Sequence, residues 1–237
     1  MKTEDLLYTH DKTSCKGWVA YDDKKASRRP AVLVAHAWAG RDAFACAKAE
    51  ALAKLGYVGF AIDMYGDARL GKDKDENAQL MTPFLTDRMM LKSRIQAAVD
   101  AIKKHPTVNA DKIAAIGFCF GGLCVLDLAR SGSAVKGVVS FHGLLGAPEN
   151  LPNADITARV LALHGYDDPM APPEQLVAFA KEMTESKADW EVLAYGNTMH
   201  AFTNPEANDP GFGTVYREAA DKRSWKAMKT FLGEVLA

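Results

Sequence analysis

Cys119 stands in the run Ile116–Gly122, whose letters are IGFCFGG, and it carries the strongest chemical signal in this chain of 237 residues. Apolar residues over 112–116 predict a buried strand before it, and a helical pattern with Leu123 and Leu126 follows it. A thiol at such a strand-to-helix turn lies at the positive end of the helix dipole, which favours the nucleophilic thiolate. The alternative is a buried structural cysteine in a glycine-rich turn.

A thiol nucleophile needs a base, and the base needs an acceptor that orients it. His200 lies in a loop after the strand pattern 190–195, and two acidic residues follow the strand pattern 159–163. Because the carboxyl ends of parallel strands meet at one edge of a sheet, we expect these groups to converge on Cys119.

Asp167 and Asp168 compete for the role of the acid. Asp168 is favoured, because Pro169 restricts the residue before it to an extended conformation. Asp167 is expected to cap the turn, or the helix that starts near Pro172.

The remaining histidines predict no metal site. His36, His142 and His164 end strand patterns and are interpreted as hydrogen-bonded residues at the sheet edge. Zinc-binding spacings of histidine or cysteine are missing, so no metal and no other cofactor is expected. The four cysteines show no disulfide framework, and a free nucleophilic thiol favours a reducing compartment, the cytoplasm.

Apolar runs alternate with helical patterns along the chain, which predicts an α/β fold: a mostly parallel central sheet with helices on both faces, in a single domain over 1–237. Two strands are expected within 3–21, and further strands over 32–35, 58–62, 135–141, 160–163 and 190–195. Helices are expected over 42–55, 88–103 and around Trp225.

Residues 65–88 are irregular in pattern. The polar part, 66–75, predicts a solvated loop, and the apolar part, 77–85, predicts either a lid or wall over the site or an ordinary helix packed on the core.

Charge and composition favour a small-molecule substrate. The net charge is -1 and no basic block occurs, which argues against nucleic acid and anionic membrane as partners. The first residues lack the order of a signal peptide, and no apolar run approaches the length of a membrane span. We expect a cytoplasmic monomer or homodimer.

Over nearly its whole length the chain resembles the dienelactone hydrolase family, the cysteine-dependent branch of the α/β-hydrolases. The motifs that carry the resemblance are Gly117–Gly122, His164–Pro169 and His200–Pro205. The resemblance implies an α/β-hydrolase fold in which Cys119 is the nucleophile, Asp168 the acid and His200 the base. It also implies hydrolysis of carboxylic esters or lactones through a covalent thioester.

Two backbone N–H groups, those of Trp38 and Phe120, are expected to form the oxyanion hole, since this fold uses both positions. For Phe84 we prefer plain core packing over a place in the site. The expected substrate pocket comprises His36, Ala37, Phe84, Leu85, Phe202 and Asn204.

Two departures from the family pattern indicate a different substrate. Ala37 stands where the resemblance implies a glutamate that helps ionise the thiol, and Asn204 where it implies an arginine that binds a carboxylate. A neutral, apolar ester or lactone is therefore favoured, with phosphotriester hydrolysis as a promiscuous side activity. The alternatives are an acyltransferase and a ligand-binding member of the fold that performs no turnover.

Overall fold

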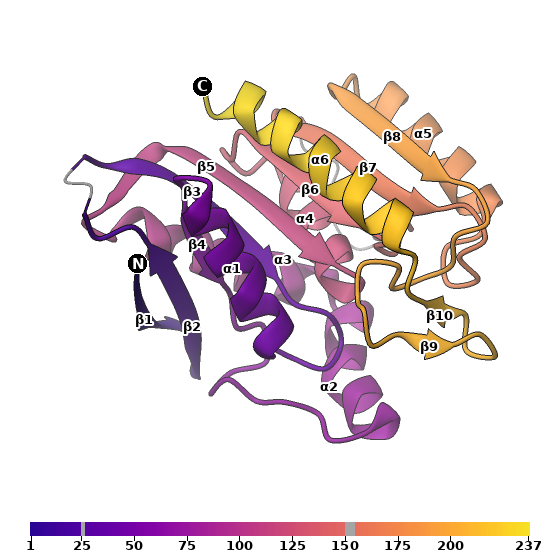
Figure 1. The fold of residues 1–237 in the computed structure, drawn as a ribbon, viewed down its shortest axis with the longest axis horizontal. Helices are drawn as coiled ribbons and strands as arrows, with labels where there is room; N and C mark the ends of the chain where they lie inside the picture. The colour runs from indigo at the N-terminus through magenta and orange to yellow at the C-terminus, as the bar shows by residue number, and fades with distance from the viewer. Residues whose placement is uncertain (25–26, 150–154) are drawn as a thin grey trace.

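A computed structural model describes residues 1–24, 27–149 and 155–237, and it has one central eight-stranded sheet in the order β1-β2-β4-β3-β5-β6-β7-β8 (Figure 1). The strands are β1 Lys2–His10, β2 Thr13–Tyr21, β3 Arg29–Ala35, β4 Val58–Ala61, β5 Val108–Phe118, β6 Gly137–Phe141, β7 Arg159–Gly165 and β8 Trp190–Tyr195.

The first two strands form an antiparallel hairpin at one edge of the sheet, with Lys2 opposite Tyr21 and His10 opposite Thr13. β1 alternates exposed and half-buried side chains, as expected for an edge strand with one wet face. β2 pairs antiparallel with β4, and all later neighbours pair in parallel. The two strands expected within 3–21 are therefore confirmed.

The inner parallel strands are buried along nearly their whole length, because helices cover both faces. β5 is longer than the five residues that the apolar run 112–116 indicates: it begins at Val108, in a polar stretch where its pairing with β3 is irregular. Backbone hydrogen bonding to β3 extends the strand there, which an apolar pattern does not report.

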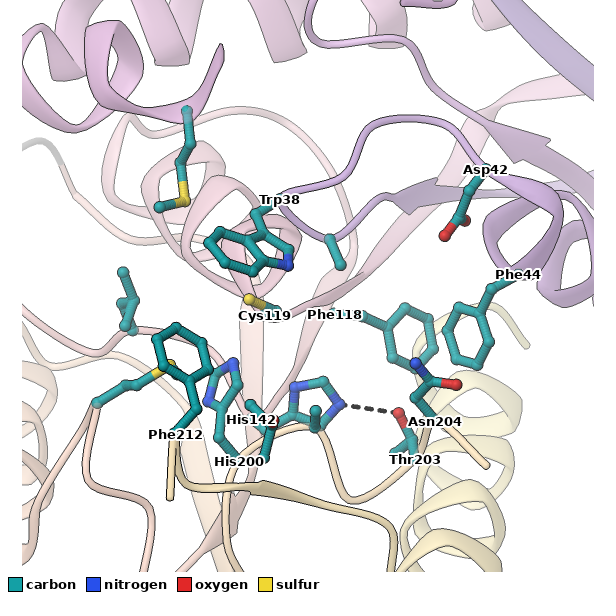
Figure 2. A pocket seen from close by; sticks show the side chains of 16 residues that line it. Trp38, Asp42, Phe44, Phe118, Cys119, His142, His200, Thr203, Asn204 and Phe212 are labelled. Atoms are coloured by element: carbon teal, nitrogen blue, oxygen red, sulfur yellow. Dashed lines mark hydrogen bonds between the residues drawn. The ribbon is translucent and has the colours of Figure 1, made fainter. Parts of the chain in front are cut away.

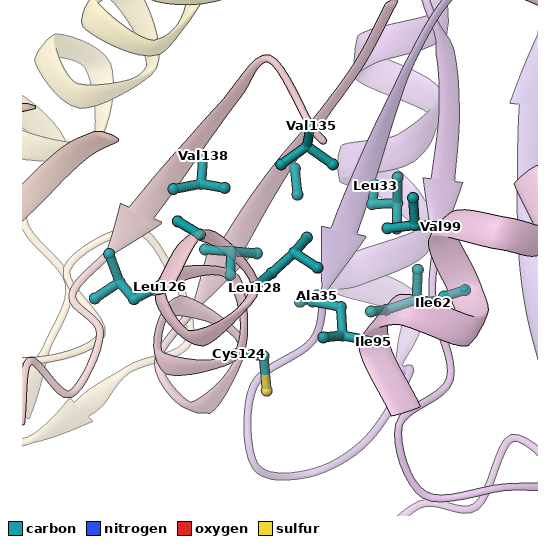
Figure 3. Packing of buried hydrophobic residues seen from close by; sticks show 14 of the residues in the cluster. Leu33, Ala35, Ile62, Ile95, Val99, Cys124, Leu126, Leu128, Val135 and Val138 are labelled. Carbon is teal, nitrogen blue, oxygen red and sulfur yellow. The ribbon is translucent and has the colours of Figure 1, made fainter. Parts of the chain in front are cut away.

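Helices form a layer on each face of the sheet (Figure 1). One layer contributes Ala49 and Met228 to a core cluster with β-strand residues, and the other contributes Ile95, Leu126 and Phe179 to a second cluster. Figure 3 shows Ile95 and Leu126 of the second cluster beside Leu33 of the sheet. The helices of the first layer are α1 Ala43–Lys54 and α6 Glu218–Val235, and those of the second are α3 Arg88–Lys103, α4 Phe120–Arg130 and α5 Pro173–Glu185. Among the described residues, no helix is both long and apolar enough to cross a membrane.

The irregular stretch 65–88 contains helix α2, Lys74–Thr86, capped by the side chain of Asp73. Its Phe84 is buried in the core and packs against the rings of Tyr65 and Phe120. Packing of this kind matches the ordinary-helix interpretation of 77–85, although Met81 of the same helix also forms part of the wall of a cavity described below. The predicted polar loop, 66–75, overlaps the first two residues of α2.

A small hairpin after β8 has no counterpart in the sequence prediction. Its strands are β9, Asn208–Asp209, and β10, Thr214–Val215. With two residues each, these strands are too short to give an alternating pattern.

Two glycines let α4 approach the sheet closely. A Cβ atom on Gly117 would lie 2.0 Å from the carbonyl oxygen of Gly121, and one on Gly121 would lie 2.1 Å from that of Ala35. Backbone atoms leave no room for adjustment at either place, so side chains larger than hydrogen are excluded at positions 117 and 121.

We therefore expect Gly121→Ala to lower the free energy of unfolding by about 2 kcal/mol or more, because α4 must move off the sheet. Gly233→Ala, in the exposed part of α6 with open space around its Cβ, is the matched control and should raise stability by about 0.5–1 kcal/mol. Urea unfolding, followed by circular dichroism, measures the free energy of unfolding of both variants, provided that their dependence on urea concentration has the same slope. Equal stability of the two variants would contradict the close-packed turn.

Candidate active site

Cys119 is the residue at which β5 turns into α4, and its backbone is strained. Its φ of 56° and ψ of -118° lie outside the regions that residues with a side chain usually occupy. The Cys119 N–H donates to the carbonyl of Phe141 at 3.0 Å, and the Cys119 carbonyl accepts from the N–H of Gly122 at 2.9 Å. These bonds hold the thiol at the N-terminus of α4, on the carboxyl edge of the sheet.

A buried carboxylate orients a buried imidazole beside this thiol. Nδ1 of His200 lies 2.7 Å from Oδ2 of Asp168, and each residue is 1% exposed. The other oxygen of Asp168 accepts from the N–H of Met170 at 2.8 Å, so the carboxylate is fixed on both sides. With Nδ1 committed to Asp168, Nε2 is the nitrogen that remains available on the cavity side.

Asp167, the competitor for this position, points to solvent. The expectation that it caps the following helix is wrong: α5 begins after Pro172 without a side-chain cap. Proline fixes the backbone of the first turn and has no N–H that needs a partner.

The β9–β10 hairpin holds His200 from its other side. The His200 N–H donates to the carbonyl of Gly213 at 3.0 Å, and the His200 carbonyl accepts from Val215 at 3.1 Å. Phe212 at the tip of the hairpin stacks on Trp38 with ring centroids 5.7 Å apart. The hairpin therefore places the imidazole and one wall of the site together.

The thiol and the imidazole shift each other's pKa in opposite directions. Burial alone raises the pKa of Cys119, but the charge of His200 and the N–H groups of Phe120 and Trp38 outweigh it and hold the pKa below its ordinary value. Burial alone lowers the pKa of His200, but the Cys119 thiolate and the hydrogen bond to Asp168 raise it above its usual range. Each group thus favours the charged form of the other, thiolate for Cys119 and imidazolium for His200.

The N–H groups of Trp38 and Phe120, which belong to two different elements, both lower the pKa of the Cys119 thiol. Phe120 begins α4, and Trp38 lies in the loop after β3. Tyr65 braces that loop, since its hydroxyl donates to the carbonyl of Trp38 at 2.8 Å. Two amides at this place can stabilise negative charge on an oxygen bound to the carbon that the sulfur attacks.

A cavity of about 180 Å³ opens beside the sulfur, with Trp38 and Phe118 on opposite sides of it (Figure 2). Most of its lining is apolar, and the polar exceptions include Asp42, Thr203 and Asn204. The full lining is Ala37, Trp38, Asp42, Phe44, Met81, Phe118, Cys119, His142, Leu144, Met170, His200, Ala201, Thr203, Asn204, Phe212 and Thr214.

Two of the six residues expected in the substrate pocket, Ala37 and Asn204, line this cavity. The other four do not, and each has a packing role instead. His36 accepts from the N–H of Met64 at 3.2 Å beneath the Trp38 loop, and Phe202 packs edge-on against His142.

Phe84 and Leu85 are the remaining two. Phe84 is part of the core, and Leu85 packs against it from α2. On the same helix, Met81 supplies the side chain that reaches the cavity. Since one helical turn separates Met81 from Leu85, the apolar pattern alone does not tell which of them faces the site.

Several lining residues were not predicted. Asp42 caps α1 by accepting from Ala45 at 3.0 Å, and a capping role is what its position before a helix indicates. The sequence does indicate a place in the site for His142, because this residue follows a buried strand just as the other polar site residues do. Phe212 lacks any such indication, since it reaches the site through a hairpin that the sequence does not reveal.

Four histidines gather near this edge without forming a metal centre. Within the described ranges, no three His, Cys, Asp or Glu side chains cluster in a way that fits an ion. Burial lowers the pKa of His36, His142 and His164, so these three rings are neutral where His200 is charged.

The fold is that of the α/β-hydrolases. An alpha/beta hydrolase from a deep-sea metagenome, 18% identical, superposes with a TM-score of 0.68 over 99% of this chain and 98% of its own. The model of the dienelactone hydrolase family matches residues 16–236, and the chain therefore belongs to that family. It is accordingly a hydrolase of the ester and lactone type.

Two proteins match most of this chain at a higher sequence identity. A dienelactone hydrolase-like promiscuous phosphotriesterase from metagenomic libraries is 37% identical, with a TM-score of 0.93 over 100% of this chain and 99% of its own. A Bradyrhizobium protein named "Probable 2-oxo-3-(5-oxofuran-2-ylidene)propanoate lactonase" is 31% identical over 215 residues, which cover 86% of this chain and 84% of that protein.

The coupled pKa shifts predict how Cys119 reacts with iodoacetamide. Alkylation of the wild type should proceed well below the ordinary thiol pKa of about 8.5, because the thiolate persists there. In His200→Asn the charge that lowers the pKa of Cys119 is gone, while the burial that raises this pKa remains. The pH midpoint of the alkylation rate should therefore move above about 8.5, the ordinary thiol pKa. Mass spectrometry of the Cys119 peptide from pH 5 to 10 measures it.

Cys119→Ala serves as the control for background labelling, since burial raises the pKa of Cys15, Cys46 and Cys124. Identical pH profiles for the wild type and His200→Asn would show that the imidazole does not act on the thiol.

Proposed function

We propose that the protein hydrolyses neutral carboxylic esters or lactones through a thioester on Cys119, with His200 as base and Asp168 as the orienting acid. The observation that carries the proposal is the 2.7 Å contact between His200 and Asp168, buried next to a thiol on a strained strand-to-helix turn. A structural cysteine needs neither the strain nor the ion pair.

In the first step the thiolate of Cys119 attacks the carbonyl carbon, and the oxygen takes up negative charge between the N–H groups of Trp38 and Phe120. Each donor of this kind is worth on the order of 3 kcal/mol of transition-state stabilisation. The imidazolium of His200 then gives its proton to the departing alkoxide, which leaves the acyl group on sulfur. Water cleaves the thioester in the second step.

The charge of the cavity supports a neutral substrate. The carboxylate of Asp42 lies in the lining, and no lysine or arginine among the described residues joins it there. A carboxylate on the substrate would therefore meet a like charge and no dedicated cation besides His200. This agrees with asparagine at position 204.

A neutral phosphotriester is the second candidate substrate, favoured by the phosphotriesterase that is 37% identical over the whole chain. The thiolate would attack phosphorus and expel an aryloxide, while the non-bridging oxygen takes up charge at the same two amides. Water must then cleave the sulfur–phosphorus bond for turnover to continue.

Stopped-flow absorbance with p-nitrophenyl butyrate tests the thioester pathway. The wild type should release a burst of nitrophenolate in proportion to enzyme, followed by steady turnover, with or without EDTA. Cys119→Ala should lose both phases, with kcat/KM reduced by roughly 10³-fold or more because the nucleophile is gone. Diethyl p-nitrophenyl phosphate in the same assay tests the second candidate.

Activity that survives in Cys119→Ala would contradict the proposal. An acyl group that stays on the wild-type protein without turnover would instead indicate a ligand-binding member of the fold. Transfer to an added alcohol that outruns hydrolysis would indicate an acyltransferase.

Asn204→Arg should change the preference for substrate charge. The wild type should have a higher kcat/KM for p-nitrophenyl butyrate than for p-nitrophenyl hemisuccinate, which carries a carboxylate. An arginine at position 204 should raise the relative kcat/KM for the hemisuccinate by roughly tenfold, the value of one charge-assisted hydrogen bond. Asn204→Gln keeps the amide and should leave the ratio unchanged; a wild-type preference for the anionic ester would refute the neutral-substrate proposal.

A further inference from the structure

Two buried ring nitrogens face the cavity without a hydrogen-bond partner in the described part of the chain: Nε2 of His200 and Nδ1 of His142. The ring centroids lie 5.1 Å apart, and the planes are inclined by 66°. Figure 2 shows the two rings side by side next to Cys119, with Nδ1 of His142 on the side of His200. The Cys119 thiolate acts on the His200 ring, but no described group serves Nδ1 of His142. Because an unpaired buried nitrogen costs free energy, Nδ1 of His142 points to a polar group that binds between the two rings.

The His142 ring is held firmly in this place. Its Nε2 lies 2.8 Å from Oγ1 of Thr203, and its backbone N–H donates to the carbonyl of Leu163 at 2.9 Å. The residue is 2% exposed and has a φ of 38°, a backbone conformation that is costly for a residue with a side chain. Strain of this kind persists where the surrounding structure imposes it, most often at sites of function.

The protonation state of His142 suits it to accept a hydrogen bond. Burial, together with the charge of His200, keeps the pKa of His142 well below its usual range, so the ring is neutral. A neutral imidazole has one donor and one acceptor. When Nε2–H donates to Thr203, Nδ1 presents its lone pair to the cavity.

We propose that His142 and His200 together bind the water that hydrolyses the thioester, which makes His142 a catalytic residue of the second step. The inference rests on the proposed function. After acylation His200 has given up its proton, so Nε2 of His200 and Nδ1 of His142 both present lone pairs. One water can donate a hydrogen to each of them and keep its own lone pair free to attack.

One water molecule is consumed when the thioester is hydrolysed. The water oxygen bonds to the thioester carbon, and Nε2 of His200 takes one proton. The carbon–sulfur bond breaks and its electron pair returns to Cys119, so the carboxylic acid leaves with the second hydrogen of the water. The thiolate and imidazolium are restored, and His142 stays neutral throughout.

His142 would act in deacylation alone, because no water takes part in acylation. In His142→Phe we expect the burst rate with p-nitrophenyl butyrate to stay within about twofold of the wild type, while steady turnover falls about tenfold or more as the water loses its orientation. Acid quenching during turnover, followed by intact-mass analysis, should then show a larger fraction of butyryl-enzyme than in the wild type.

Thr203 offers a matched pair of milder variants. Thr203→Val removes the hydroxyl that orients the His142 ring and should raise the butyryl-enzyme fraction, whereas Thr203→Ser keeps the hydroxyl and should not. This pair decides the question if His142→Phe fails to fold.

A butyryl-enzyme fraction no higher than that of the wild type in both His142→Phe and Thr203→Val would overturn the inference. A parallel fall of burst and steady rates would do the same, since it indicates a structural role. If the wild type never carries a butyryl group on Cys119 in the quenched samples, the proposed function itself fails, and the two failures are thereby told apart.

Discussion

The contact between α4 and the carboxyl ends of β3 and β5 is the constraint on which the site depends. Gly117 and Gly121 have no room for a Cβ atom, and Cys119 between them adopts a backbone conformation that its side chain disfavours. Once this contact forms, the thiol stands at the positive end of α4 and the N–H of Phe120 points to the sulfur. The positions of the Cys119 thiol and of the Phe120 N–H are thus consequences of one close approach between a helix and a sheet, so neither can be adjusted without the other.

The rest of the site is supported by buried polar groups that have no part in the chemistry. Asp63 accepts four backbone N–H groups, which fixes the turn after β4, and Tyr65 in that turn braces the carbonyl of Trp38. On the other side, Arg130 binds Glu182 through two bonds of 2.8 Å and donates to the carbonyl of Leu145. Loops that carry site residues are therefore held in place by Asp63, Tyr65 and Arg130, which costs little because each of these three side chains has its hydrogen-bond partners.

Much of this arrangement could be predicted from the sequence, because parallel strands bring the residues that follow them to one edge. Cys119, His142, Asp168 and His200 follow β5, β6, β7 and β8, four consecutive neighbours in the sheet. The α/β-hydrolase fold and the family were predicted and are confirmed, while the catalytic roles stay a prediction. The lining of the cavity could not be predicted in full, since the choice between Met81, Phe84 and Leu85 depends on how α2 rotates against the core, and Phe212 arrives on a hairpin too short for a pattern.

The β9–β10 hairpin gives the imidazole of His200 a support of low intrinsic stability. Gly213 at its tip and Val215 in β10 make both backbone bonds of His200. The hairpin is tied to α2 by an exposed ion pair of 2.8 Å between Lys74 and Asp209. Exposed pairs contribute little, and short peripheral segments open more easily than a central sheet. Heat or denaturant should thus release the hairpin while the sheet remains folded. The working lifetime of the enzyme is then set by a local opening of a few residues, and the melting temperature of the whole chain overstates it.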